Sequence, residues 1–211
     1  MAGILFADGK IGSNAFMEMT DTYVNRQQEI IRASAALFDR VGYHGASMNM
    51  IAEAVNLGKP TLYHYFRSKS EILFAMHREL MSVLVDAHNA RQQETSRPDE
   101  LLRGLCYDTI KFIVEHPGYT RAFFEHYHDL DESQRSALSE HRKSYLNMVI
   151  ELIRSGIKDG LFAECDVRNT ALAFLGACNW TYQWMPSDRR LDVSAVAENL
   201  SRLFLSGLMR R

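Results

Sequence analysis

Prolines stand at only four positions of this 211-residue chain, and the sequence between them follows a helical pattern almost without interruption. Proline lacks the backbone N–H that a helix interior needs, so prolines mark where helices begin or end. These positions are Pro60, Pro98, Pro117 and Pro186. No strand pattern competes with the helical one. The sequence therefore predicts an all-α protein.

The first clear helix shows an apolar stripe with helical spacing, which predicts one buried face over residues 23–41. Gly42 stands where a C-terminal cap belongs. The stripe consists of Ile30, Ile31, Ser34, Leu37, Phe38 and Val41. Residues 1–20 contain three glycines and lack this periodicity, so we expect a flexible arm.

The remaining periodic segments bring the expected number of helices to nine. The expected ranges are 23–41, 47–55, 59–66, 69–92, 98–115, 117–128, 132–158, 167–185 and 191–209. The second and third helices are short and are separated by the turn residues Asn56 to Gly58. Together they predict a helix-turn-helix, whose second helix of about 10 Å fits the major groove of DNA.

The segment around this motif closely resembles the Tet repressor (TetR) family of bacterial transcription regulators. The resemblance covers roughly 50 residues and is carried by Gly42-Tyr-His-Gly-Ala-Ser47, Ile51-Ala-Glu-Ala54 and the run from Pro60 to Leu73. It implies a nine-helix fold with a DNA-binding domain at 21–70 and a ligand-binding and dimerisation domain at 71–211. Asn56, Gly58 and Pro60 replace residues common in relatives, so the preferred base sequence is not carried over.

Side chains of the motif divide into a contact set and a packing set. Hydroxyls and an ammonium are suited to phosphates, and the candidates are Ser47, Thr61, Tyr63, Tyr65 and Lys69. Lys59, Pro60 and His64 lie where family members reach base edges, and Asn49 is a further candidate for a base or a phosphate. Ile51, Ala52, Leu62 and Phe66 should pack inward.

The formal net charge of −2 argues at first against a nucleic-acid partner. The charge is unevenly distributed, however, because residues 20–70 hold six basic and four acidic residues, while residues 71–211 hold 17 and 20. A modestly basic segment therefore adjoins an acidic body, which is compatible with DNA binding.

The last two expected helices carry wide apolar stripes, and either stripe is explained by the protein's own core or by a partner. One runs from Val193 to Leu208 and the other from Ala171 to Met185. The family resemblance implies a homodimer in which these helices form a four-helix bundle. A two-fold dimer would place two recognition helices on a palindromic operator.

Aromatic and apolar side chains in the second domain are candidates for a hydrophobic ligand pocket, although core packing explains each of them singly. They are Phe112, Phe123, Phe124, Tyr127, Tyr145, Met148, Trp180 and Trp184. Arg121, Arg142 and Lys143 are candidates for an anionic head group, with solvated surface as the alternative. Residues 179–184 resemble the C-terminal domains of TetR-family repressors that control fatty-acid or sterol-side-chain breakdown and respond to acyl-CoA thioesters.

Other functional classes find little support in the sequence. Three cysteines without CxxC spacing fit a reducing cytoplasm, and no signal peptide or membrane span is expected. His126 and His128 are two residues apart and would point different ways on a helix, so we predict no metal site there. No catalytic or cofactor fingerprint is present, so we predict neither an enzyme nor a cofactor.

The sequence thus indicates a homodimeric, ligand-responsive transcriptional repressor that a hydrophobic effector, an acyl-CoA for example, releases from a palindromic operator. The alternative is a helical ligand-binding or scaffolding protein with a non-functional helix-turn-helix. The sequence leaves open the effector's identity, the operator and the regulated genes, and whether the ligand releases or promotes DNA binding.

Overall fold

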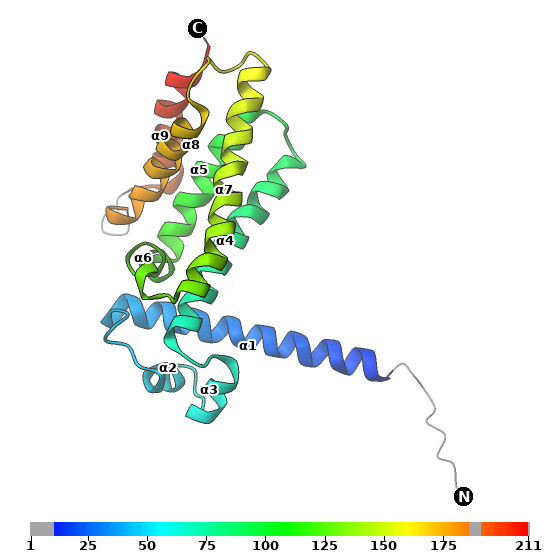
Figure 1. Ribbon diagram of the computed structural model, residues 1–211, viewed down its shortest axis with the longest axis vertical. Coiled ribbons are helices and arrows are strands. Elements are labelled where there is room, and N and C mark those ends of the chain that lie inside the picture. Colours follow the sequence, from blue (N-terminus) through cyan, green and yellow to red (C-terminus); the bar gives the residue numbers. More distant parts are fainter. Residues whose placement is uncertain (1–10, 186–190, 211) are drawn as a thin grey trace, which may run out of the picture.

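The computed structural model describes residues 11–185 and 191–210, and these ranges form nine α-helices and two short 3₁₀ segments (Figure 1). The all-α prediction is therefore confirmed. The helices are α1 (Ile11–Val41), α2 (Met48–Ala54), α3 (Lys59–Tyr65), α4 (Lys69–Gln92), α5 (Pro98–Glu115), α6 (Pro117–Glu125), α7 (Glu132–Lys158), α8 (Val167–Trp180) and α9 (Val193–Leu208). The 3₁₀ segments are η1 (Tyr127–Asp129) and η2 (Thr181–Gln183).

Helix α1 is longer than the sequence predicts, because it begins at Ile11 rather than near residue 23. The segment after Gly12 contains neither proline nor glycine until Gly42, so the backbone can stay helical without an apolar stripe. The expected arm is thus helical from Ile11 to residue 20, and its earlier part lies outside the described residues. Figure 1 shows this end of α1 projecting away from the other helices.

The apolar stripe of α1 is buried as predicted, except at its last member. Ile30 and Ser34 are fully buried, whereas Val41 is 39% exposed. Val41 is the final residue of the helix, and the chain turns away at Gly42, whose φ of 76° suits a residue without a side chain. The helix therefore loses its buried face one turn before it ends.

Two predicted helices end early and tighten into 3₁₀ turns. Helix α6 ends at Glu125 because His126 adopts φ −114°, ψ 17°, and the Asp129 N–H then donates to the His126 carbonyl at 3.0 Å. Helix α8 ends at Trp180, where the Thr181 hydroxyl donates to the Cys178 carbonyl at 2.7 Å. Such local hydroxyl bonds compete with the helical ladder. The expected end is residue 185, and Pro186, which is expected to stop the helix there, lies outside the described residues.

Helix α5 lies at the centre of the second domain and packs against α4, α7, α8 and α9. Helices α1 to α3 form a separate group at one end of α4, and α6 packs on α1 (Figure 1). Gly118 makes the contact between α1 and α6 very close, because a Cβ there would stand 2.2 Å from the Ala35 carbonyl oxygen. None of the described helices combines the length and apolar character needed to cross a bilayer.

Candidate nucleic-acid interface and ligand cavity

The helix-turn-helix is held by local capping and by a small buried core. Ser47 caps α2 by accepting from the Met50 N–H at 3.2 Å, and Asn56 makes the turn in a left-handed conformation with φ 52°. Pro60 stands in the first turn of α3, where its missing N–H is harmless. The four residues predicted to pack inward, Ile51, Ala52, Leu62 and Phe66, are all at most 5% exposed, so that prediction is confirmed.

Most of the predicted DNA-contacting side chains lie on the exposed side of this unit. The exposed residues are Ser47, Asn49, Lys59, Pro60, Thr61, Tyr63 and His64. Six of the seven are polar or aromatic, and five lie consecutively or nearly so at the beginning and along one side of α3. Helix α3 therefore presents a contiguous surface of donors and rings that a major groove can accept.

Tyr65 and Lys69 are partly buried and make contacts within the protein. The Tyr65 ring stacks on Tyr23 of α1, with the ring centroids 4.8 Å apart. The Lys69 Nζ donates to the Tyr43 carbonyl at 2.7 Å and to the Ala46 carbonyl at 2.6 Å. Burial lowers the pKa of Lys69, and the negative charge of Asp129 opposes that shift. Through these two hydrogen bonds, Lys69 of α4 stabilises the loop between α1 and α2.

Sequence reasoning missed the part of α1 that supports the motif. Besides the Tyr23 ring, the Arg26 Nη2 donates to the Val55 carbonyl at 3.0 Å, at the end of α2. Both residues lie on the first predicted helix, but neither belongs to its apolar stripe. Their spacing of three residues places them on the same side of α1, and that was the available signal.

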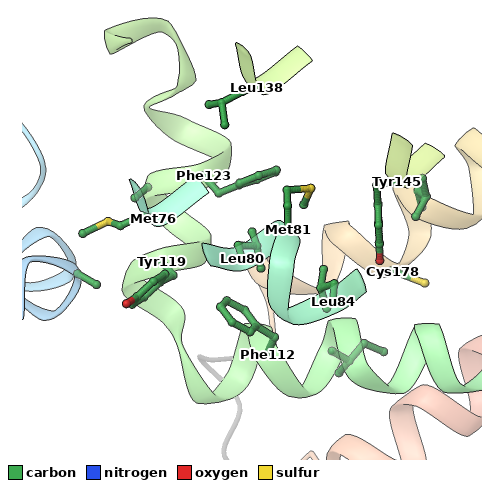
Figure 2. Close-up of a cluster of buried hydrophobic side chains, with 14 of the residues drawn as sticks. Met76, Leu80, Met81, Leu84, Phe112, Tyr119, Phe123, Leu138, Tyr145 and Cys178 are labelled. Atoms are coloured by element: carbon green, nitrogen blue, oxygen red, sulfur yellow. The ribbon is translucent and has the colours of Figure 1, made fainter. Parts of the chain in front are cut away.

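A cavity of about 350 Å³ lies in the second domain among five helices, α4 to α8. Its wall is mostly apolar, and part of it is seen in Figure 2, where Met81, Leu84, Phe123 and Tyr145 belong to one buried cluster. The lining residues are Leu80, Met81, Leu84, Thr109, Ile113, Thr120, Phe123, Phe124, Arg142, Tyr145, Leu146, Leu172, Leu175, Gly176 and Asn179. The volume lies at the small end of the range for ligand pockets.

Polar groups enter this cavity at a few points. The Thr109 and Tyr145 hydroxyls lie 3.4 Å apart, and burial raises the pKa of Tyr145 above its ordinary value. Among the described residues, Arg142 is the one cationic side chain of the lining. Its guanidinium lies 5.5 Å from the Phe123 ring centroid and 4.8 Å from that of Tyr127. An apolar wall with one cation suits a ligand that has an apolar body and an anionic or carbonyl group.

The eight predicted ligand residues separate into three that line this cavity and five that do not. Phe123, Phe124 and Tyr145 line it. Phe112 packs on His116 and Tyr119, Tyr127 lies under Arg142, and Met148 lines a different groove beside His88. Trp180 is 62% exposed and Trp184 is 37% exposed.

The three candidate cations for a head group also differ in their surroundings. Arg121 pairs with Asp39 at 3.3 Å, and Lys143 pairs with Glu140 at 2.7 Å on the surface of α7. Arg142 alone lies on the cavity. The structure therefore singles out Arg142 within a pair of adjacent basic residues that the sequence presents as equivalent.

His77 of α4 is buried beside the same ring cluster, 4.6 Å from the Phe123 ring centroid. The side chain is 1% exposed, and neither imidazole nitrogen has a hydrogen-bond partner of normal geometry among the described residues. Burial lowers the pKa of His77 to about 3, and the positive charge of Arg142 adds to the effect. His77 is therefore neutral at physiological pH.

Helices α8 and α9 both expose large apolar side chains. Leu172 is 46% exposed, Trp180 62% and Leu203 63%, although Ala197 and Leu208 of the α9 stripe are buried against the rest of the chain. The stripe of α9 is thus partly intramolecular core, with α5 as its main neighbour. Its remaining apolar surface is open in the isolated chain.

Comparison with known protein families identifies two matching regions. The family model described as "Bacterial regulatory proteins, tetR family" matches residues 30–76, which contain the helix-turn-helix. The model described as "Tetracyclin repressor-like, C-terminal domain" matches residues 95–208, more than half of the chain.

Individual proteins agree with these matches. The solved TetR family transcriptional regulator PfmR from Thermus thermophilus is 29% identical, with a TM-score of 0.78 over 86% of this chain and 99% of its own. AibR in complex with isovaleryl coenzyme A and operator DNA is 26% identical, with a TM-score of 0.75 over 84% of this chain and 97% of its own. The fatty acid metabolism regulator protein of Bacillus subtilis is 23% identical over 87% of this chain and 95% of its own.

Proposed function

The chain belongs to the TetR family of bacterial transcriptional regulators, and we propose that it is a homodimeric repressor released from its operator by a small acyl thioester. The single observation that supports the effector class most directly is the apolar cavity with Arg142 in its wall. A relative of similar fold has been solved with isovaleryl coenzyme A, and its small acyl group agrees with a cavity of about 350 Å³.

DNA recognition in this proposal depends on the exposed surface of α3 and the beginning of α2. Lys59 and His64 would reach base edges, and the hydroxyls of Ser47, Thr61 and Tyr63 would contact phosphates. Asn49 and Pro60 are exposed as well. Tyr65 and Lys69 would act chiefly by fixing the position of this surface, because their polar or aromatic groups are already engaged within the protein.

The dimer would form through the exposed apolar surface of α8 and α9, because Trp180 and Leu203 are large apolar side chains that the isolated chain leaves in water. We expect Leu203→Glu to weaken the dimer and, with it, operator binding, as measured by sedimentation and by fluorescence anisotropy. Val83→Glu is the matched control, since Val83 is 44% exposed on α4. A Leu203→Glu protein that stays dimeric would place the interface elsewhere.

Release requires the ligand to bind more tightly to a conformer in which the two recognition helices are badly spaced for successive major grooves. Helix α6 lines the cavity with Thr120, Phe123 and Phe124, and the same helix packs on α1 through Gly118. A ligand that displaces α6 therefore displaces α1, which supports α3 through Tyr23.

The experiment is a titration of operator DNA from the chain's own upstream region, with and without acyl-CoA of two to twelve carbons, followed by anisotropy. We expect steep weakening of DNA binding with salt and release by the shorter thioesters. Arg142→Gln should need about tenfold more thioester for release, because a hydrogen bond to a charged group is lost. Its unliganded operator affinity should be unchanged.

Lys143→Gln is the control for Arg142→Gln, because Lys143 is the adjacent basic residue but lies outside the cavity lining. If both variants need the same thioester concentration for release, Arg142 does not contact the ligand. Failure of the wild-type protein to bind any upstream DNA would instead favour the alternative of a helical ligand-binding protein with a non-functional helix-turn-helix.

A further inference from the structure

Two histidines and an aspartate from different parts of the chain meet where the helix-turn-helix domain touches the ligand domain. His44 lies in the loop between α1 and α2, His126 caps the C-terminal end of α6, and Asp129 belongs to η1. One ligand atom from each residue lies within 4.8 Å of the others. We propose that these three side chains form a binding site for a divalent transition metal, which joins the two domains.

The distances already approach those of a metal centre. The Asp129 Oδ2 lies 3.0 Å from the His126 Nδ1 and 3.5 Å from the His44 Nε2. In tetrahedral zinc with Zn–N bonds of 2.0–2.1 Å, neighbouring ligand atoms are roughly 3.4 Å apart. The His44 side chain is 73% exposed and can rotate toward the other two, so small side-chain motions are enough to close the site.

The backbone around His44 is fixed, although its side chain is exposed. Lys69 holds the carbonyls of Tyr43 and Ala46, which flank His44 on both sides. The Tyr43 ring is buried and lies 5.0 Å from the His126 ring, centroid to centroid. The backbone of the loop is therefore already fixed with His44 close to His126, which limits the entropy lost when a metal binds.

The donor set indicates the class of metal. Two imidazole nitrogens and one carboxylate oxygen suit zinc and its first-row neighbours, whereas magnesium and calcium prefer oxygen ligands alone. The negative end of the α6 dipole also favours a cation at His126. Three protein ligands leave a fourth position for water, which is accessible because His44 faces solvent.

The competing explanation is that Asp129 simply pairs with His126 and His44 and that no metal is involved. This explanation predicts that the protein has no metal affinity. Sequence spacing could not show this site, because His44 and His126 are 82 residues apart. The site is also independent of the acyl-thioester proposal, since none of its three residues lines the cavity.

The test is titration of the tag-free full-length protein with ZnCl₂ by calorimetry, with MgCl₂ as the negative control. We expect one zinc per chain, and at least about tenfold weaker binding for His44→Gln, His126→Gln and Asp129→Asn. His128→Gln is the matched control, because His128 is exposed and one residue from Asp129 but outside the cluster, and it should bind zinc like the wild type.

A second readout tests the bridge between domains. Zinc should raise the thermal unfolding midpoint of the wild type and of His128→Gln but not that of His44→Gln, since binding to the folded state alone stabilises it. His44→Gln should fold normally because its side chain is exposed. Absence of zinc binding by the wild type, or unchanged zinc affinity in His44→Gln, would overturn the proposal.

Discussion

The DNA-binding surface and the ligand cavity are built in opposite ways. The surface comes from one continuous segment, Ser47 to His64, over a fully buried Leu62. The cavity takes its lining from five helices between Leu80 and Asn179, and His77, buried beside it, has no hydrogen-bond partner of normal geometry among the described residues. The small, well-packed helix-turn-helix domain can thus be positioned by the larger ligand domain, whose cavity leaves it room to rearrange.

Truncation of a buried leucine to alanine should lower the free energy of unfolding more in the helix-turn-helix than in the cavity wall. Leu62→Ala leaves a void in a tightly packed unit and should lower the free energy of unfolding by about 2–5 kcal/mol. Leu80→Ala should cost about 2 kcal/mol, the low end, because Leu80 borders space that is already empty and has fewer contacts to lose. Urea denaturation of both variants measures the difference.

Operator binding separates the two leucines further. Leu62→Ala should lose operator binding together with the orientation of α3, and Leu80→Ala should keep it and shift release toward longer acyl chains. Equal stability losses in the two variants would contradict the view that the two regions are packed differently.

Acid should weaken the ligand domain rather than the DNA-binding domain, because the buried histidines among the described residues are His77 and His88, both on α4. The folded-state pKa of His77 is lowered to about 3 from the ordinary 6.5, so the unfolded chain binds the extra proton. The stabilisation is complete above pH 6.5 and is lost as pH falls toward 3. Between pH 7 and pH 5 the loss in the free energy of unfolding due to His77 is about 2 kcal/mol.

The measurement compares chemical denaturation of the wild type and His77→Phe at pH 7 and pH 5. The variant should lose about 2 kcal/mol less over this interval, because the ring it places among Phe123 and Tyr127 has no proton to bind. Parallel losses in the two proteins would show that His77 is solvated in the native state.

Charge removal on the recognition surface should affect DNA and leave stability intact. Lys59 is exposed at the start of α3, so Lys59→Ala should weaken operator binding about tenfold, roughly 1.4 kcal/mol, with an unchanged denaturation curve. Lys158→Ala, at the far end of α7, controls for net charge. Comparable weakening by both changes would mean that general electrostatics, rather than α3, determines affinity.

The smallest effect is expected at the cap of α2. Ser47→Ala removes the acceptor for the Met50 N–H and should cost about 1 kcal/mol of stability. Ser47→Asp restores the acceptor and the stability, but its charge should repel phosphate. Operator affinity that follows stability in both variants would assign Ser47 to capping alone.

The same contrast explains what could be predicted from sequence. The bounds of α2 and α3 and the inward-packing residues Ile51, Ala52, Leu62 and Phe66 follow from local periodicity, because a single segment of sequence contains the whole pattern. The cavity depends on how five helices are rotated, and aromatic content does not report rotation. Trp180 directly follows the lining residue Asn179, and yet its side chain is exposed rather than part of the lining.

Some misses have a different origin. The pairing of Lys69 with the loop carbonyls of Tyr43 and Ala46, and the approach of His44 to His126, join residues far apart in the chain. The spacing of residues in the sequence does not predict such long-range contacts. The early ends of α6 and α8 depend on single local hydrogen bonds, which periodicity cannot register.

The close approach of α6 to α1 at Gly118 makes main chain meet main chain, 2.2 Å from where a Cβ would stand. A contact between side chains yields when one of them changes rotamer, on a timescale of picoseconds to nanoseconds. Backbone against backbone has no such degree of freedom, so the pair must move as one solid piece. Any response to a ligand at this seam should therefore be slow and concerted, observable as exchange on the microsecond-to-millisecond timescale rather than as a local fluctuation.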